Sequence, residues 1–308
     1  MVESERRWLV VLDCDKTMWD HPDATSLNPP FSKLSDDEII DSSSDRVRLN
    51  RGLLRFLRYL KLKGHLIAIA SWNEPYNVIE LLKLFNLKEY FDEIVVEPHP
   101  NKDIMIEKIL KKLKARPQNV IFIDDNPVMH RLVKKKFPSV ISVEYSKDLK
   151  DFEEALNYFS NILGTPPKAY ISFSDLHTQS TDFIKRYIEI VRECGLNTLP
   201  EPNLTNNNLH ELLPNEFFRK HLQMLDNADL LIADVSSPSH KVGMEIMYAY
   251  MKNKKIFVTY SRDSKVSSMI RGMPRIHIVK YDTISELKNA LWKELHKSLR
   301  LSEFPDTA

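Results

Sequence analysis

Short apolar segments alternate with helical patterns along the whole chain, and this alternation limits the possible folds more than any other feature. The segments are apolar at nearly every position, as expected for parallel strands that helices cover on both faces. In the first half we predict strands at residues 8–12, 66–70, 93–96, 120–123 and 140–143, with helices such as 53–63 and 102–114 between them. The pattern therefore predicts an α/β fold with a doubly wound, Rossmann-like parallel sheet.

The same alternation starts again after a linker of sequence Gly-Thr-Pro-Pro-Lys at residues 164–168. Beyond it we predict strands at 169–172, 229–235, 255–260 and 276–279, and helices at 181–194, 215–227, 243–252 and 283–298. A chain of 308 residues is long enough for two domains of roughly 150 residues each. We therefore predict two doubly wound α/β domains in tandem, residues 1–163 and 169–308.

The charge balance and the cysteine content exclude several classes of protein. Lys+Arg 44 against Asp+Glu 43 gives a formal charge of +1, which argues against general binding to nucleic acid or to an anionic membrane. No apolar run approaches the roughly 18 to 20 residues of a membrane span, and the charged N-terminus is unlike a signal peptide. Two cysteines, Cys14 and Cys194, suit a reducing compartment. We expect a soluble cytoplasmic protein.

Polar side chains follow several strands of the first predicted sheet, at the edge where parallel strands end. Residues two apart on a strand point to the same side, so the carboxylates of Asp13 and Asp15 are expected to converge. Gathered carboxylates repel unless a cation joins them, and oxygen ligands favour Mg²⁺. One Asp-x-Asp motif alone is usually a cap or a turn, but matching strand ends in the right order favour a site. The side chains concerned are Asp13, Asp15, Thr17, Ser71, Lys102, Asp124 and Asp125.

With the insertion Pro29-Pro30-Phe31, these residues resemble the haloacid dehalogenase superfamily, and within it the magnesium-dependent phosphatases, over about residues 5–147. The resemblance implies that Asp13 is the nucleophile of an aspartyl-phosphate and that Asp15 protonates the leaving oxygen. It implies that Ser71 and Lys102 hold the phosphoryl oxygens.

The resemblance also implies a site for Mg²⁺ as the cofactor. The ligands would be Asp13, the carbonyl of Asp15 and one of Asp124 and Asp125, of which we favour Asp125.

Two features bear on the phosphatase substrate. The run Ser71-Trp72-Asn73 departs from the usual Ser/Thr-Arg-Thr, which adds Trp72 and Asn73 to the candidate substrate-binding residues. There is no large cap domain; residues 18–48 form a flap that is too long for a plain connection. We therefore expect an open site that accepts large or varied phosphoesters.

A second candidate site lies in residues 230–245, which are predicted to form a strand, a polar loop and the start of a helix. Free N–H groups at a helix start bind phosphate, Ser239 adds a hydroxyl, and Gly243 would let a ligand approach the backbone. Glu245 is predicted in the first helical turn, where a carboxylate is also favoured simply by the helix dipole.

The segments Pro238-Ser239…Glu245 and Ser268-Met-Ile-Arg-Gly272 resemble the nucleoside 2-deoxyribosyltransferase superfamily, most closely the 2'-deoxynucleoside 5'-monophosphate N-glycosidases, over about residues 168–295. The resemblance implies that Glu245 attacks the anomeric carbon and that water resolves the glycosyl-enzyme. It implies a homodimer through the C-terminal domain, in which Ser239 and the partner's copy of Ser267 bind the 5'-phosphate. Tyr170 would lie near the sugar, and Ser174 is a further candidate substrate-binding residue.

Two residues depart from this second pattern. His221 stands where the family has an aspartate, and Phe173 stands where it has a glycine. His221 is either an acid toward the leaving base or an ordinary surface histidine.

Together the two resemblances predict a bifunctional hydrolase whose partners are small nucleotides and phosphoesters. One site would cleave a nucleoside 5'-monophosphate to base and sugar 5-phosphate, and the other would hydrolyse phosphomonoesters with Mg²⁺. Two alternatives stay open for the C-terminal half: a deoxyribosyltransferase and a non-catalytic nucleotide sensor.

Overall fold

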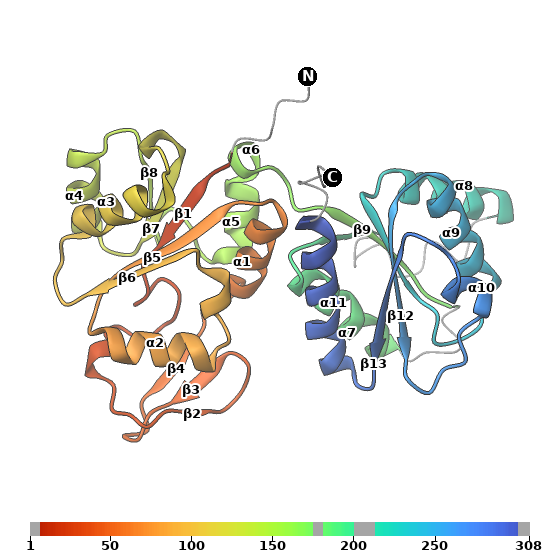
Figure 1. Cartoon of the computed structure of the whole chain (residues 1–308), viewed down its shortest axis with the longest axis horizontal. Helices are drawn as coiled ribbons and strands as arrows, with labels where there is room; N and C mark the ends of the chain where they lie inside the picture. The colour runs from red at the N-terminus through yellow and green to blue at the C-terminus, as the bar shows by residue number, and fades with distance from the viewer. Residues whose placement is uncertain (1–6, 175–180, 200–212, 301–308) are drawn as a thin grey trace, which may run out of the picture. The chain divides into compact units, whose positions relative to one another are not determined.

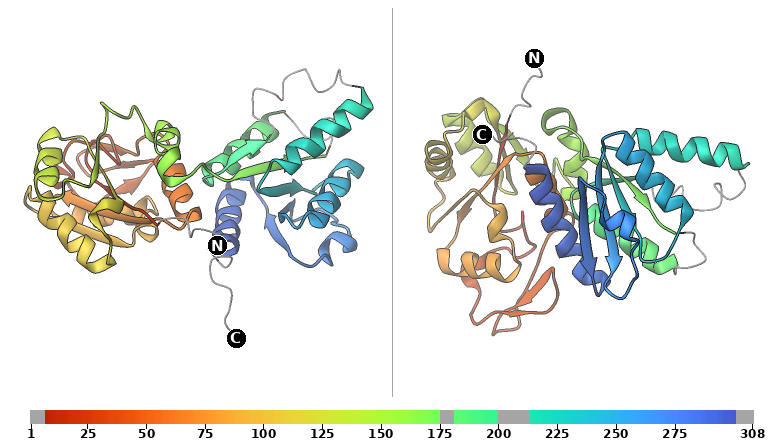
Figure 2. Two further views of the ribbon diagram at one scale, coloured as in Figure 1. Left: turned by 90° about the horizontal axis from the view of Figure 1, so that it is seen from above. Right: turned by 45° about the vertical axis from the view of Figure 1, so that its right-hand side comes forward.

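The computed structural model describes residues 7–174, 181–199 and 213–300 (Figure 1). The chain divides into two compact units, Met1–Thr165 and Pro166–Ala308, which are considered separately below. Each unit is built on one five-stranded parallel sheet with helices on both faces (Figure 2). The predicted fold class, two parallel-sheet α/β domains in tandem, is confirmed.

The first unit contains the sheet β6-β5-β1-β7-β8. Its strands are β1 (Leu9–Leu12), β5 (Leu66–Trp72), β6 (Glu93–Glu97), β7 (Val120–Asp124) and β8 (Ile141–Glu144). Its helices are α1 (Leu53–Leu62), α2 (Pro75–Leu84), α3 (Lys102–Leu113), α4 (Pro127–Lys136), α5 (Phe152–Tyr158) and α6 (Ser160–Leu163).

The central strand β1 is buried along its whole length, because helices pack on both of its faces. Leu9 and Val11 belong to the core cluster with Met105 and Ile109 of α3 and Val133 of α4. The intervening residues of β1 point to the opposite face, where α1 packs against α5. The nearly uninterrupted apolar sequence of this strand is explained by this double coverage.

The predicted flap at residues 18–48 is an ordered element with its own small sheet. It contains the 3₁₀ helix η1 (Ala24–Ser26) and the antiparallel strands β2 (Ser32–Lys33), β3 (Glu38–Ile40) and β4 (Arg46–Arg48). Asn77 of α2 holds its base, donating hydrogen bonds to the carbonyls of Ala24 (2.8 Å) and Leu27 (2.9 Å).

The second unit contains the sheet β10-β9-β11-β12-β13. Its strands are β9 (Lys168–Ser172), β10 (Asn197–Leu199), β11 (Leu230–Asp234), β12 (Lys255–Ser261) and β13 (Ile276–Tyr281). Its helices are α7 (Thr181–Glu193), α8 (Pro214–Asp226), α9 (His240–Met251), α10 (Ser268–Arg271) and α11 (Ile284–Arg300). Strand β10 was not predicted, because three residues are too few to establish a period.

Helix α9 begins earlier than the sequence suggested. Its N-cap is Ser239 and its first residue is His240, so the expected start at Gly243 is wrong. Glu245 consequently lies in the second turn rather than the first, and no acidic residue occupies the first turn. The helix dipole therefore does not account for Glu245, and its partners must be sought in the rest of the fold.

The strand order reverses once in each sheet, and ligands bind in α/β sheets at such points. In the first unit the reversal lies between β1 and β7, and Asp13 follows β1 there, its N–H donating to the carbonyl of Ile123 (3.0 Å). In the second unit it lies between β9 and β11. Both candidate sites therefore lie at the positions that the topology favours.

Within the described part of the chain, every helix is too short or too polar to cross a bilayer.

Candidate active sites

Three carboxylates meet at the ends of β1 and β7. Oxygens of Asp13, Asp124 and Asp125 all lie within 4.8 Å of one another. Lys102, the first residue of α3, enters the same space, where its Nζ pairs with Asp13 and lies 3.3 Å from Asp124 Oδ2. The same Nζ donates to the carbonyl of Ala70 (2.5 Å), which fixes the ammonium group between β5 and the carboxylates.

The charges of this cluster are strongly perturbed because the groups are buried. Burial raises the pKa of Asp13 to about 8; Lys102 opposes the rise, while Asp124 and Asp15 add to it. Burial also raises the pKa of Asp125, and Asp124 adds to the effect. Burial lowers the pKa of Lys102, but Asp13 and Asp124 more than reverse this and leave its pKa above the ordinary value. One ammonium group thus faces three carboxylates.

These residues fit a Mg²⁺ ion. The donor set consists of hard carboxylate oxygens, the ligands that this ion prefers. Asp124 is almost fully buried, and among the described residues its Oδ2 has no hydrogen-bond donor. Such an atom is costly to bury unless a cation approaches it, and the ion pair with Lys102 satisfies it only in part.

The side chain of Asp15 is turned away from this cluster and toward the flap. Its Oδ1 accepts from Trp19 Nε1 (2.8 Å), its Oδ2 accepts from Asn73 Nδ2 (2.8 Å), and both oxygens lie 3.2 Å from the N–H of Ala24. Burial raises the pKa of Asp15, although the hydrogen bonds from Asn73 and Trp19 oppose the rise. A raised pKa suits a group that must carry a proton before donating it.

Asn73 connects three parts of this site. Its Nδ2 donates to Ser71 Oγ (2.9 Å) as well as to Asp15, and its Oδ1 accepts from both the N–H (3.0 Å) and the hydroxyl (2.9 Å) of Thr25 in the flap. Ser71 is completely buried, whereas the side chain of Trp72 is open to solvent. In this chain the third residue of the run is therefore Asn73, whose side-chain amide bonds both the flap and Asp15.

Thr17 is also buried, and within the described residues its hydroxyl has no hydrogen-bond partner. Its carbonyl accepts from Asn50 Nδ2 (2.7 Å), which ties the loop after β1 to the turn before α1.

The second site is organised around Glu245. Its Oε1 accepts from Tyr170 OH (2.8 Å) and lies 3.2 Å from His221 Nδ1, and its Oε2 accepts from Ser172 Oγ. Tyr170 and Ser172 are two residues apart on β9, so their side chains project to the same side. The carboxylate is buried and held by three side chains from two elements.

These contacts keep Glu245 ionised. Burial raises the pKa of Glu245, but the hydrogen bond from His221, the charge of Lys241 and the bonds from Ser172 and Tyr170 together bring it below its ordinary value. Burial and the neighbouring Glu245 raise the pKa of Tyr170 well above its usual range, so its hydroxyl stays a donor. An ionised and oriented carboxylate is suited to nucleophilic attack.

His221 belongs to this cluster and is not an ordinary surface histidine. Its Nδ1 contacts Tyr170 OH as well as Glu245, and its ring lies on that of Phe217 with centroids 4.1 Å apart. Its Nε2 is buried and has no hydrogen-bond partner within the described residues. One ring nitrogen is therefore engaged with the carboxylate, which ties His221 to Glu245.

The remaining predicted residues of the second unit lie outside this cluster. Ser239 Oγ accepts from the N–H of Val242 (3.4 Å) and caps α9, and the N–H of Gly243 donates to the Ser239 carbonyl (3.2 Å). A Cβ at Gly243 would meet nothing within 4 Å. Ser267 caps α10 through the N–H of Met269 (3.2 Å) and is exposed.

Phe173 and Ser174 follow β9. Ser174 is buried, and the ring of Phe173 packs edge-on against Tyr187 of α7, with centroids 4.8 Å apart. The Phe173 side chain, which stands where the family has a glycine, therefore packs against α7.

Sequence reasoning missed two residues that hold the candidate nucleophile and acid. Ser172 donates to Glu245, and Trp19 donates to Asp15. A signal existed for Ser172, because Tyr170-x-Ser172 ends a strand with two polar groups on one side, just as Asp13-x-Asp15 does. No comparable signal existed for Trp19, whose role depends on the path of the flap.

Comparisons with known proteins find relatives of two kinds. Residues 15–130 match the haloacid dehalogenase-like hydrolase family. Human magnesium-dependent phosphatase 1 is 28% identical over 167 residues, which are 54% of this chain and 94% of that protein. The resemblance of the N-terminal half to this superfamily is confirmed.

A second group of relatives is of a different kind. A protein of Syntrophotalea carbinolica assigned as 2'-deoxynucleoside 5'-phosphate N-hydrolase 1 is 37% identical over 90 residues, or 29% of this chain, and the match spans 61% of that protein. A solved structure of the CMP N-glycosidase BcmB from Clostridium botulinum is 20% identical, with a TM-score of 0.33, and the match covers 40% of this chain and 96% of that one. The resemblance to nucleotide N-hydrolases is confirmed, and the chain spans 55% to 61% of the length of two such relatives.

Proposed function

We propose that the chain is a bifunctional hydrolase with one active site in each unit. The first unit would be a Mg²⁺-dependent phosphomonoesterase, and the second would cleave the N-glycosidic bond of a nucleoside 5'-monophosphate. The observation that carries the proposal is that each unit holds a buried carboxylate near the point where its strand order reverses. In the first unit this is Asp13, which pairs with Lys102. In the second it is Glu245, which is held by Tyr170, Ser172 and His221. The two cysteines of the chain are both buried, and so low a cysteine content suits a cytoplasmic enzyme.

In the phosphatase, Asp13 attacks phosphorus and forms an aspartyl-phosphate. Asp15, held by Trp19 and Asn73, gives its proton to the leaving oxygen and then takes one from the water that hydrolyses the acyl phosphate. Lys102 and Ser71 hold the phosphoryl oxygens. A Mg²⁺ ion held by Asp13, the Asp15 carbonyl and Asp124 or Asp125 would neutralise charge on the transferring group.

In the glycosidase, Glu245 attacks the anomeric carbon from a position that its hydrogen bonds fix. We expect His221 to serve the leaving base through Nε2, which has no partner among the described residues. Water then attacks the glycosyl-enzyme and releases a sugar 5-phosphate. Ser239 caps α9 as an acceptor, which leaves its hydroxyl proton free for the 5'-phosphate at this helix start.

The two alternatives for the second unit are less well supported. A non-catalytic sensor rested on His221 and Phe173, but His221 bonds the carboxylate and Phe173 packs on α7. A deoxyribosyltransferase acts on unphosphorylated nucleosides and would need Ser239 and Ser267 only as the helix caps that they form, not as phosphate ligands.

The two reactions would run in series, with base release first. Ser239 and the start of α9 are suited to read a 5'-phosphate, and removing that phosphate first would delete the group that they bind. Base release instead yields a sugar 5-phosphate, a small phosphoester suited to the uncapped first site.

The test is a panel of ribo- and deoxyribonucleoside 5'-monophosphates, scored for free base and for phosphate with and without EDTA. We expect EDTA to abolish phosphate release, because the first cluster needs a cation, and to leave base release unchanged, because Glu245 acts without one. A sugar 5-phosphate should accumulate in the chelated reaction. Phosphate release that survives EDTA would contradict the phosphatase, and binding of nucleotides without base release would contradict the glycosidase.

We further propose that the second unit forms a homodimer that completes its phosphate site. Helix α9 exposes Met244, Met247 and Met251, which recur on one face, and Met269 of α10 is 80% exposed. A contiguous apolar stripe of this kind marks an interaction surface. Ser267, which has no hydrogen bond to Ser239 or Glu245 within one described chain, would reach the partner's site.

The dimer makes a prediction about mixed subunits. Light scattering should give the mass of two chains, and Ser267→Ala should raise the KM for nucleotide by about tenfold, as expected when a charge-assisted hydrogen bond is lost. Mixing Ser267→Ala with Glu245→Ala chains should restore a fully built site, because one chain supplies Glu245 and the other Ser267. A monomer that cleaves nucleotides at the full rate would exclude the shared site.

A further inference from the structure

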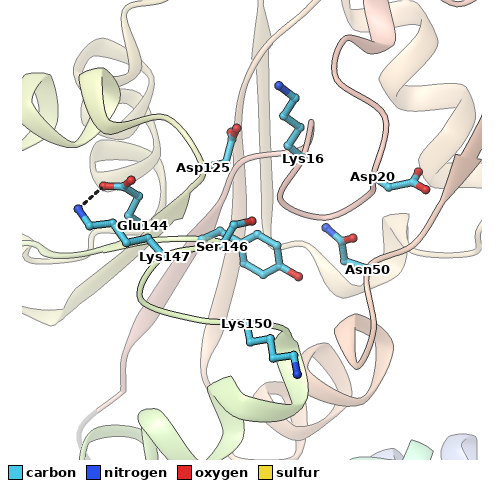
Figure 3. Close-up of a pocket in the computed structure, with 9 residues that line it drawn as sticks. Lys16, Asp20, Asn50, Asp125, Glu144, Ser146, Lys147 and Lys150 are labelled. Carbon is cyan, nitrogen blue, oxygen red and sulfur yellow. Dashed lines mark hydrogen bonds and ion pairs between the residues drawn. The ribbon is translucent and has the colours of Figure 1, made fainter.

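A polar pocket adjoins the carboxylate cluster of the first unit, and no step described so far uses it. Its volume is about 540 Å³, and Asp125 belongs both to its wall and to the cluster. Figure 3 shows that its side chains come from the loops after β1 and β7, the turn before α1, and the end of β8 with the segment that follows it. A phosphoester with its phosphorus at Asp13 could therefore place its leaving group in this pocket.

The pocket has a balanced charge. Its charged side chains are three lysines and three carboxylates, Lys16, Lys147, Lys150, Asp20, Asp125 and Glu144. Lys147 is already paired with Glu144 at 3.1 Å. With Asp125 given to the metal cluster, Lys16 and Lys150 face Asp20, an excess of one cation and less than a second dianionic group would call for.

The pocket also offers little to a nucleobase. Every residue that lines it carries a polar side-chain group, whereas sites for flat aromatic ligands are mostly apolar. Its one aromatic residue, Tyr145, has its ring stacked against Phe152, with centroids 5.1 Å apart. The ring therefore packs in the core, and only its hydroxyl edge can contact a ligand in the pocket.

Several polar atoms in the pocket have no partner in the part of the chain that the structure describes. Lys16 and Lys150 form no ion pair within the described residues, and the hydroxyl of Tyr145 donates to no other residue. Asn50 uses its Nδ2 on Thr17 and leaves its Oδ1 open; Asp20 accepts one bond from the N–H of Arg48 (2.8 Å) and keeps its second oxygen. Donors and acceptors thus lie on the same wall, and hydroxyl groups, which both donate and accept, match such a wall.

The segment after β8 that carries part of this wall is firmly held. The N–H of Ser146 donates to the Leu149 carbonyl (2.9 Å), and Asp148 Oδ2 accepts from the N–H of Glu144 (2.9 Å). Lys150 then precedes Asp151, the N-cap of α5. Its backbone is fixed by its own N–H, which donates to Glu154 (2.7 Å).

We propose that this pocket is the leaving-group site of the phosphatase and that it binds the polyhydroxylated ring of a sugar phosphate. This assignment rests on the proposed phosphatase activity. It makes sugar phosphates, rather than intact nucleotides, the substrates of that activity. It gives the proposed reaction series a physical basis, because the pocket accepts the product of base release and offers nothing to the base.

The test compares two esters of similar size. Ribose 5-phosphate carries ring hydroxyls, and cyclopentylmethyl phosphate has the same ring size without them. We expect Tyr145→Phe and Lys150→Gln each to lower kcat/KM for ribose 5-phosphate about 5- to 10-fold, the effect of one lost hydrogen bond, and to leave cyclopentylmethyl phosphate unaffected. Tyr158→Phe and Lys134→Gln are matched controls on exposed faces of α5 and α4, and should alter neither ester.

An equal loss for both esters, or no loss for either, would overturn the assignment. So would a preference of the wild-type enzyme for a nucleoside 5'-monophosphate or for ribose 1,5-bisphosphate, which would make the pocket a nucleoside site or an anion site. Failure of the phosphatase itself has a different signature, namely no metal-dependent hydrolysis of either ester and no effect of Asp13→Asn.

Discussion

Replacing Asp13 by asparagine is expected to lower metal-dependent phosphate release by about 10³-fold or more, the scale of a lost nucleophile. The substitution keeps the size and shape of the side chain, so the strand end and the contacts of Lys102 with Asp124 and Ala70 should persist. The carboxylate oxygen that would attack phosphorus is gone, and one oxygen of the metal cluster becomes an amide. Phosphate release from phenyl phosphate at saturating Mg²⁺ measures the effect directly.

The matched control is Asp36→Asn, an exposed flap residue of the same unit. It removes the same charge outside the cluster and should hydrolyse phenyl phosphate at the wild-type rate. Thermal unfolding of both variants with and without Mg²⁺ separates loss of chemistry from loss of fold. Full turnover by Asp13→Asn would contradict the assignment of Asp13 as the nucleophile. Full turnover of the wild type in EDTA would contradict the metal-dependent mechanism.

The residues of the first site were predictable because their positions follow from topology. A carboxylate that follows a buried strand of a parallel sheet must lie at the edge where all such strands end. Asp13 and Asp124 were placed by that rule alone, and the structure brings them within one cluster with Asp125. Lys102 was reachable in the same way, as the first residue of the helix after β6.

The second site shows the limit of that rule. Glu245 was chosen from a sequence motif, and the helix-start argument put it in the wrong turn. What makes it a candidate nucleophile is its contacts with Ser172 of β9 and His221 of α8, residues 73 and 24 positions away in the chain. Local periodicity carries no information about such pairs, because they depend on how α8 and α9 pack on the sheet.

The flap shows a second limit, which concerns the roles of residues rather than their positions. The length of residues 18–48 predicted a functional element, and the structure orders it around Asp15 through Trp19 and Asn73. The sequence Ser71-Trp72-Asn73 does not predict that the Asn73 amide bonds Thr25 of the flap, 48 positions away. The polar pocket was unpredictable for the same reason, because its walls come from separate loops and it exists only once they are packed.

Replacing Glu245 by alanine is expected to abolish base release from a nucleoside 5'-monophosphate, by about 10³-fold or more, because no other carboxylate contacts Tyr170, Ser172 or His221 within the described residues. Glu245→Gln should be equally inactive while retaining hydrogen bonds to its neighbours, which separates the lost charge from a lost contact. Glu189→Ala, on the exposed face of α7, is the matched control and should release base normally.

The same variant tests the order of the two reactions. If the phosphatase acts on the sugar 5-phosphate, Glu245→Ala must stop phosphate release from the nucleotide although its first site is intact, and it must still hydrolyse added ribose 5-phosphate at the wild-type rate. Asp13→Asn should give the opposite pattern, with normal base release and accumulation of sugar 5-phosphate. Chromatography of base, nucleotide and sugar phosphate in one reaction follows all three. Phosphate release from the nucleotide by Glu245→Ala at the wild-type rate would show that the first site does not wait for the second. The serial order would then be wrong even if both activities were real.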